Sequence, residues 1–82
     1  MQVTVKLYGV LRRHRPPDAS GAPHRPFELQ LPAGSTVADL NGRLGIADGM
    51  VNAAAVNGAA VEPDAQLQEG DQVSLFPPAA GG

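Results

Sequence analysis

Residues 32–46, PAGSTVADLNGRLGI, carry the helical pattern on which the fold depends. Thr36 and Asp39 have the spacing of a capping box, with Asp in the place of the usual Glu or Gln. Gly45 suits the left-handed backbone that ends many helices. The apolar side chains recur at helical spacing and share one face: Val37, Leu40 and Leu44. The stretch therefore predicts one short helix, at about residues 36–44.

Two segments before the helix alternate between apolar and polar residues, as half-buried strands do. The first is QVTVKLY at 2–8 and the second is FELQL at 27–31. Residues 12–26 between them are rich in Pro and Gly, which exclude any helix longer than a turn at Val10–Arg13. We expect an N-terminal hairpin whose connecting loop is long and mobile.

The segments after the helix predict further strands. NAAAVNGAAV at 52–61 reads as two strands joined by a tight turn, because Asn57-Gly58 is a strong hairpin signal. In the next loop Leu67 is the expected inward anchor and residues 69–71 the expected turn. VSLF at 73–76 is the last strand. A sheet with one apolar face and a single helix bury their apolar surfaces by packing together. We therefore expect an α+β fold in which a mixed sheet wraps across one helix.

Length and composition restrict the class of protein. The chain has 82 residues, enough for one domain with one modest core. The absence of cysteine excludes a disulfide framework, a cysteine nucleophile, an iron–sulfur cluster and a thiolate zinc site. The beginning, MQVTVKLYGV, lacks the pattern of a signal peptide, and no apolar run is long enough to span a membrane. We expect a cytoplasmic protein with no membrane partner.

The charges are unevenly distributed along the sequence. The formal net charge is -2, and Arg43 is the only cation from residue 36 onward. The C-terminal half is thus expected to present an acidic surface, which either steers the protein toward a basic partner or is simply a solvated face. Nucleic-acid binding is disfavoured because the basic stretch RRHRP at 12–16 is short and lacks interleaved aromatic residues.

No group of residues has the pattern of a self-contained active site. His14 and His24 lie in the Pro-rich loop without cysteines or paired carboxylates at ligand spacing, so we expect no metal site and no cofactor bound by this chain. No Gly-rich phosphate loop follows a strand and opens a helix. The serines have no evident base partner: Ser20, Ser35 and Ser74. We do not expect an enzyme that acts alone.

Residues 77–82, PPAAGG, have the composition of an exposed tail. Pro77 and Pro78 cannot donate hydrogen bonds to a sheet and favour an extended path. The residues after them have almost no side-chain bulk, so they fit a narrow channel: Ala79, Ala80, Gly81 and Gly82. We therefore expect a domain at 1–76 and a flexible tail at 77–82 whose functional group is the Gly82 carboxylate. The alternative is a frayed end without function.

Alternation in the last strand places Val73 and Leu75 in the core and Phe76 on the outward face, beside the tail. The same alternation puts Val56 inward and Ala55 outward on a neighbouring strand. An exposed aromatic residue next to a functional tail suits an interface anchor. The predicted partner contacts are therefore Phe76 and Ala55. The alternative is that Phe76 folds over the sheet edge and completes the core.

Several of these features together resemble the ubiquitin-like β-grasp sulfur carriers of the MoaD/ThiS family. They are the β-β-α-β-β order, LPAGSTVADL at 31–40, AAVNGAAV at 54–61, and the ending LQEGDQVSLFPPAAGG at 67–82. The resemblance covers most of the chain outside residues 12–26, and the ending is its most specific part. The Phe-Pro-Pro sequence resembles that of the small subunit of molybdopterin synthase more closely. The short central helical region instead resembles that of the thiamin sulfur carrier. The Pro-rich loop departs from both.

The resemblance implies that the protein carries sulfur on its C-terminus. An E1-like adenylyltransferase would use ATP to adenylate the Gly82 carboxylate, and sulfur from a persulfide or similar donor would displace AMP. The product would be a thiocarboxylate, delivered while residues 77–81 thread into the partner. The expected acceptor is the large subunit of molybdopterin synthase or an equivalent enzyme, where two such transfers build the dithiolene of the cofactor. The carrier would act only in complex with these enzymes.

Other functions stay open at this point. The sulfur could go to thiamin instead, or the protein could be a modifier that joins Gly82 to a lysine on a target. Its own single lysine, Lys6, gives it little capacity for lysine-linked chains on itself. A third class is a β-grasp interaction module with an incidental end. A thiocarboxylate, an isopeptide adduct and an unaltered terminus distinguish the three.

Overall fold

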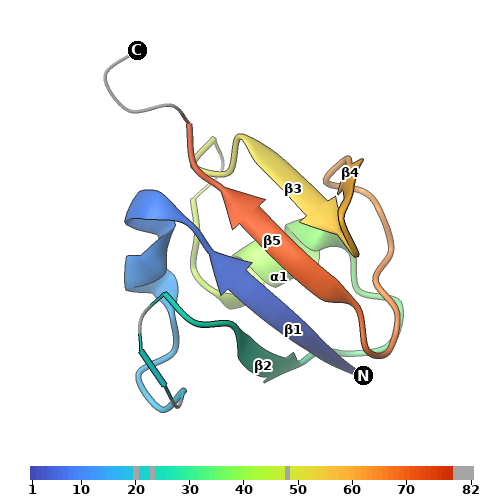
Figure 1. The fold of residues 1–82 in the computed structure, drawn as a ribbon. Helices are drawn as coiled ribbons and strands as arrows, with labels where there is room; N and C mark the ends of the chain where they lie inside the picture. Colours follow the sequence, from blue (N-terminus) through green and yellow to red (C-terminus); the bar gives the residue numbers. More distant parts are fainter. Residues whose placement is uncertain (20, 23, 48, 79–82) are drawn as a thin grey trace.

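The computed structural model describes residues 1–19, 21–22, 24–47 and 49–78. Within these residues the chain forms a five-stranded sheet, one α-helix and one 3-10 helix (Figure 1). In chain order the elements are β1 (Gln2–Leu7), η1 (Gly9–His14), β2 (Phe27–Gln30), α1 (Val37–Arg43), β3 (Ala53–Val56), β4 (Ala59–Val61) and β5 (Gln72–Phe76). The predicted order of strands and helix is confirmed.

The sheet is mixed, with the strand order β2-β1-β5-β3-β4. β1 pairs antiparallel with β2, which confirms the N-terminal hairpin, and pairs parallel with β5. β3 pairs antiparallel with both β4 and β5. Helix α1 lies across one face of the sheet (Figure 1). This is the α+β arrangement, with a mixed sheet packed on one helix, that the sequence predicts.

Local signals in the sequence account for the bounds of α1. The Thr36 hydroxyl accepts a hydrogen bond from the Asp39 N–H (3.2 Å), and the Asp39 carboxylate accepts one from the Thr36 N–H (2.9 Å). The predicted capping box is therefore confirmed. At the other end, Gly45 adopts a φ of 73°, and its N–H donates to the Gly42 carbonyl. A non-glycine residue would be strained in this left-handed backbone.

The core fills the space between α1 and the sheet. Side chains alternate between buried and partly exposed along β1, β2 and β5, as a sheet with one covered face requires. The predicted inward residues of β5, Val73 and Leu75, are 1% and 0% exposed. The buried hydrophobic side chains are Val3, Val5, Leu7, Leu11, Phe27, Leu29, Leu31, Val37, Leu40, Leu44, Ile46, Ala54, Leu67, Val73 and Leu75.

The turn predictions also hold. Asn57 and Gly58 both have positive φ, 52° and 86°, as a tight turn between β3 and β4 requires. Leu67 is buried, as expected of the loop's inward anchor. Gly70 has a φ of 83°, and the Asp71 N–H donates to the Gln68 carbonyl (3.1 Å), which forms the turn that leads into β5.

The segment between β1 and β2 contains more structure than the sequence indicates. The helical turn predicted at Val10–Arg13 belongs to η1, which is longer, and it is anchored by the fully buried Leu11. Beyond η1, the Arg15 guanidinium donates to the Ala19 carbonyl (3.1 Å) and stacks 5.6 Å from the centre of the Phe27 ring. The predicted mobility of this segment concerns motion and stays a prediction.

Candidate functional site

The C-terminal segment leaves the sheet from its middle. β5 lies between β1 and β3, and its last hydrogen bonds run from the Tyr8 N–H to the Leu75 carbonyl (3.2 Å) and from the Asn52 N–H to the Phe76 carbonyl (2.8 Å). Pro77 and Pro78, which follow, have no N–H to continue the ladder. The chain is therefore held by neighbours on both sides up to Phe76.

The structure describes only the base of the predicted tail. Pro77 is half-buried and Pro78 is exposed. The other predicted site residues lie outside the described residues: Ala79, Ala80, Gly81 and Gly82. The predicted division into a domain at 1–76 and a flexible tail at 77–82 stays a prediction.

Phe76 lies on the outward face of the sheet, as the alternation predicts. It is opposite Ala53 in the register of β3 and β5, and its side chain is half-buried. Its ring stacks on Tyr8, with the ring centres 4.5 Å apart and the planes at 21°. Phe76 does not belong to the core between sheet and helix, so the alternative in which it completes that core is wrong.

Ala55 also lies on the outward face, but it is not the neighbour of Phe76. The register pairs Ala55 with Ser74 of β5 and with Ala60 of β4, whereas Ala53 pairs with Phe76. Alternation identifies the face of each residue but not the pairing of the strands, which depends on the loops. The outward face predicted for Ala55 is thus observed, and the residue directly beside Phe76 is Ala53, two positions earlier on the same strand.

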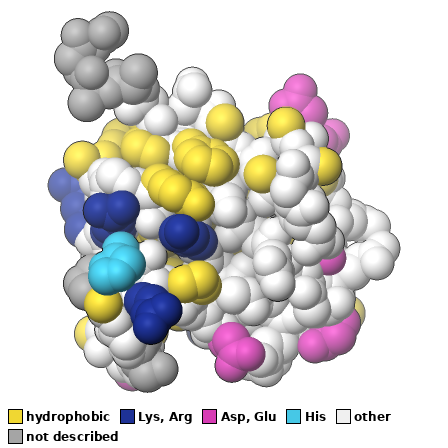
Figure 2. All heavy atoms as spheres, in the orientation of Figure 1, with side chains coloured by type: hydrophobic (Ala, Val, Ile, Leu, Met, Phe, Trp, Pro, Cys, Tyr) yellow, Lys and Arg dark blue, Asp and Glu magenta, His cyan; other side chains and the backbone are white. Residues whose placement is uncertain are grey.

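An apolar surface surrounds the point where β5 ends. We call it the exit patch and define it as Tyr8, Ala53, Phe76 and Pro77. Figure 2 shows hydrophobic side chains gathered on this part of the sheet face. Val10, the large hydrophobic residue that is most exposed in the described part of the chain, is 54% exposed at the start of the adjoining η1.

A single cation lies at the border of the exit patch on β1. The Lys6 ammonium is 5.0 Å from the centre of the Tyr8 ring, a distance at which a cation is attracted to the ring face. Lys6 pairs with Ser74 in the parallel register of β1 and β5. The sole lysine of the chain is therefore on the same face as Phe76.

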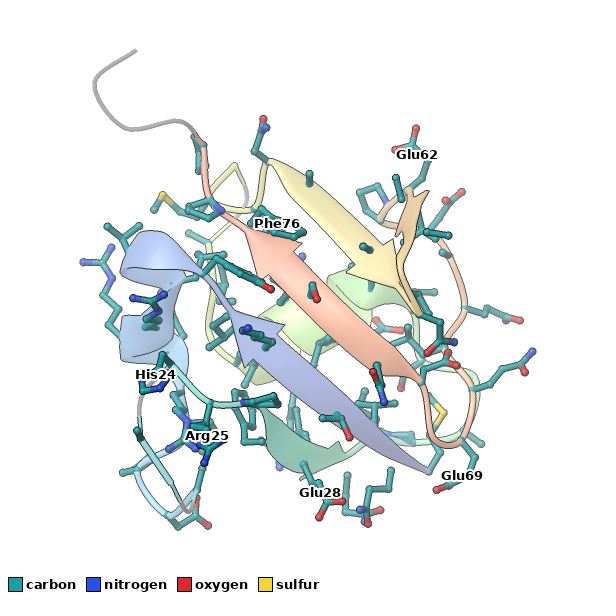
Figure 3. The ribbon with its side chains drawn as sticks, in the orientation of Figure 1. His24, Arg25, Glu28, Glu62, Glu69 and Phe76 are labelled. Atoms are coloured by element: carbon teal, nitrogen blue, oxygen red, sulfur yellow. The ribbon has the colours of Figure 1, made fainter. Side chains whose placement is uncertain are left out.

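Basic side chains lie near the exit patch. Because β1 and β5 are parallel, the end of β5 lies beside the end of β1 and the η1 helix that follows. The last turn of η1 carries Arg12, Arg13 and His14. Glu69 lies on the other side of the molecule (Figure 3), at the turn before β5 begins. Basic residues of η1 therefore adjoin the end of β5, and the acidic surface expected of the C-terminal half stays a prediction.

Two residues of this site were missed as site residues by sequence reasoning. Alternation placed Tyr8 on the outward face, but only the parallel pairing of β1 with β5 brings it to Phe76. Gly9 follows the first predicted strand; it has a φ of 56° and lies against Pro77. The only feature of the sequence that could have identified Gly9 as a site residue is its position directly after an alternating strand.

Two properties of the described residues bear on metal binding and membranes. None of their His, Cys, Asp and Glu side chains gather in groups of three or more that could hold a metal ion. None of the helices formed by these residues is long and apolar enough to cross a membrane.

Comparisons with known proteins agree with this architecture. The chain is similar in structure to small archaeal modifier protein 1 of Haloferax volcanii, with a TM-score of 0.65, 22% identity and full coverage of both chains. It is also similar to a protein from Pyrococcus furiosus assigned as molybdopterin converting factor subunit 1, with a TM-score of 0.67 and 28% identity over 96% of this chain and 99% of that one. A complex of subunits 1 and 2 of the molybdopterin-converting factor from Helicobacter pylori matches with a TM-score of 0.59 and 24% identity over the full length of both chains.

The sequence itself assigns the family. No curated protein matches significantly. The model of the ThiS family matches residues 19–82, well over half of the chain, and its match includes β2 to β5 and both terminal glycines. The fold and the family match agree with the resemblance seen in the sequence: the chain belongs to the ThiS family of ubiquitin-like sulfur carriers.

Proposed function

We propose that the protein carries sulfur as a thiocarboxylate on Gly82. The observation that supports this most strongly is the family match, which runs through Gly81 and Gly82. The structure adds two supporting features. Backbone pairing of β5 stops at Phe76, and two prolines separate that strand from the terminal residues.

The chemistry requires activation of the carboxylate by another protein. A carboxylate is a poor electrophile at neutral pH, so the Gly82 oxygen first attacks the α-phosphorus of ATP and pyrophosphate leaves. A reduced sulfur donor then attacks the carbonyl carbon, and AMP leaves with the bonding electron pair. The product is a C-terminal thiocarboxylate. The ATP site belongs to an E1-like adenylyltransferase, and this chain contributes the acyl group.

The exit patch suits the surface that contacts such enzymes. Phe76 and Tyr8 form a stacked, half-exposed aromatic pair beside the base of the tail. Aromatic residues that become fully buried on binding often dominate the energy of an interface. We therefore propose Phe76 as the anchor and assign Ala55 a place at the margin of the same contact. Both the adenylyltransferase and the sulfur-accepting enzyme would use this face.

The acceptor that we propose is the large subunit of molybdopterin synthase. The P. furiosus and H. pylori neighbours are both subunits of molybdopterin-converting factors, and the second is in complex with its subunit 2. The Phe76-Pro77-Pro78 sequence supports the same assignment. The alternative acceptor is an enzyme of the thiamin pathway, which the short helix α1 favours.

The absence of cysteine gives this proposal a sharp test. Because the chain has none, a thiol-reactive label has no cysteine on this protein to modify. The protein is incubated with its adenylyltransferase, ATP and a sulfur donor, and is then separated by size and treated with the label. We expect labelling that depends on ATP and on the sulfur donor. No labelling of the wild-type chain would contradict the proposal.

Two variants control for the position of the label. Deleting Gly82, or adding one residue after it, moves the carboxylate away from the end that the enzyme recognises. Both variants should remain folded and lose labelling, because the carboxylate is positioned by fit in a narrow site. An extended variant that is labelled like the wild type would exclude Gly82 as the sulfur carrier.

A protein modifier is the second candidate. The observation that favours it is the structural similarity to small archaeal modifier protein 1. In that case the activated Gly82 would form an amide with a lysine of a target, and the label would find no thiocarboxylate. Adducts of higher mass that contain this chain would then replace the labelled species.

A further inference from the structure

Gly9 and Pro77 are in direct contact where β1 and β5 end. A β-carbon placed on Gly9 would lie only 3.0 Å from Cγ of Pro77. Two carbon atoms in favourable contact are about 3.5–4.0 Å apart. A side chain at Gly9 would therefore crowd the proline ring, and either the ring or the β1–η1 turn would have to move slightly to relieve the contact.

The sheet explains why these two residues meet. Leu7 and Leu75 are partners in the parallel register of β1 and β5, so the two strands end side by side. Phe76 is fixed by the hydrogen bond from Asn52 to its carbonyl. Pro77 follows at once, and its ring restricts its own φ to about −65°. The Pro77 ring lies close to the Gly9 backbone, so this contact bears directly on the path of the chain at Pro77.

We propose that Gly9 is a positioning residue that sets the direction in which the chain leaves the sheet. Its missing side chain lets the Pro77 ring lie against the β1–η1 turn. A larger residue would displace this ring, and with it the segment that must bring the Gly82 carboxylate to a nucleotide bound in another protein. This inference rests on the proposed sulfur-carrier function and adds a residue outside the tail that controls it.

The left-handed backbone of Gly9 gives a competing reason for glycine at this position. With a φ of 56°, Gly9 favours glycine whether or not Pro77 is near. Gly45 distinguishes backbone strain from the contact with Pro77. It also has a positive φ, 73°, but a β-carbon there would meet nothing within 4 Å. Gly45→Ala therefore introduces backbone strain without a collision at the tail.

The experiment is a double-mutant cycle between the two residues in contact. Gly9→Ala is made alone and in a Pro77→Ala background, and Gly45→Ala is the matched control. The kcat and KM of thiocarboxylate formation are measured with the adenylyltransferase, ATP and sulfur donor, at a temperature where every variant is folded. Thermal unfolding of the same proteins is measured without any partner.

Gly9→Ala should lower kcat/KM by about tenfold or more in the wild-type background, because small displacements of a reacting group are costly. In the Pro77→Ala background the same change should have an effect of less than about threefold, because the colliding ring is gone. Gly45→Ala should lower the melting temperature but leave kcat/KM within about twofold of the wild type.

Three results would overturn the inference. They are an equal effect of Gly9→Ala in both backgrounds, no effect in either, or an equal loss of kcat/KM in Gly45→Ala. A wild-type chain that forms no thiocarboxylate contradicts the proposed function instead. In that case the contact is still tested by thermal unfolding, where Gly9→Ala should cost less in the Pro77→Ala background than in the wild type.

Discussion

The two ends of β5 are held in different ways. At the start, the Asn57 side chain donates to the Asp71 carboxylate (3.0 Å) and accepts from the Gln72 N–H (2.9 Å). The other Asp71 carboxylate oxygen accepts from the Gln68 N–H (2.8 Å). At the end, the backbone is still hydrogen-bonded, but the side-chain contacts are apolar: the Tyr8–Phe76 stack and the Gly9–Pro77 contact.

We therefore assign the two ends of β5 different roles: the start stabilises the fold, and the end contacts a partner. The polar groups at the start of β5 bond to one another, so their main effect is to stabilise the fold. The apolar groups at the end are half-exposed, and additional burial would be favourable. A partner thus gains most by binding the end of β5, where the tail begins.

The largest expected effect concerns the inward face of β5. Leu75 is fully buried, so Leu75→Ala should cost about 2–5 kcal/mol in the free energy of unfolding. Denaturant unfolding measures this directly. A Leu75→Ala protein as stable as the wild type would mean that the register of β5 is shifted by one residue, which reverses every assignment of face on this strand.

The next effect concerns the outward neighbour of Leu75. Phe76→Ala removes the ring stack with Tyr8 and the half-buried area of the ring, so it should cost less than the ~3–5 kcal/mol of stability expected for a fully buried Phe. It should weaken binding to the adenylyltransferase or the acceptor by about 2 kcal/mol or more, measured by calorimetry. Ala60→Ser, on the edge strand β4 and outside the exit patch, is the control and should change the affinity little. Equal affinity of Phe76→Ala and wild type would remove the exit patch from the interface.

The start of β5 should show the opposite behaviour. Asn57→Gly keeps a residue suited to positive φ but removes both side-chain hydrogen bonds, so it should cost about 1–2 kcal/mol of stability. Its rate of thiocarboxylate formation, measured on folded protein, should match the wild type. A slower reaction without a change in stability would show that the start of β5 also takes part in function.

The smallest expected effect is electrostatic. Arg12 and Arg13 lie in the η1 turn that adjoins the end of β5, so they should speed association with a partner whose surface is acidic. Replacing both by Glu should slow association several-fold at low ionic strength, with less effect at high salt. Glu62→Lys, on a different part of the molecule, is the control. Faster association after the double replacement would indicate a basic partner surface.

The parts of the fold that could be predicted are those determined by residues close together in the sequence. The Thr36–Asp39 capping box, the Asn57-Gly58 turn and the alternation along each strand depend on residues close in sequence, and all of them are confirmed. The faces of Leu75 and Phe76 follow from the same alternation. The family could be recognised from the sequence because its most specific motif, the ending at 67–82, is continuous.

The parts that could not be predicted depend on distant pairing. Tyr8 and Phe76 meet only because β1 and β5 are parallel neighbours, and the signal for parallel pairing is not local. The same pairing brings the basic turn of η1, rather than the acidic loop, to the end of β5. The length of η1 was missed because the buried anchor Leu11 stands among basic residues in a segment rich in Pro and Gly.

The most direct test of the central claim is fragmentation mass spectrometry of the C-terminal peptide after reaction with the adenylyltransferase, ATP and a sulfur donor. Replacing one oxygen by sulfur adds nearly the same mass as oxidising a methionine, so the position of the added mass must be determined. The two methionines, Met1 and Met50, are far from the C-terminus in sequence, so the fragments separate these cases. We expect one oxygen replaced by sulfur at Gly82. An unchanged Gly82, or Gly82 joined to a lysine of another protein, would contradict the sulfur-carrier account.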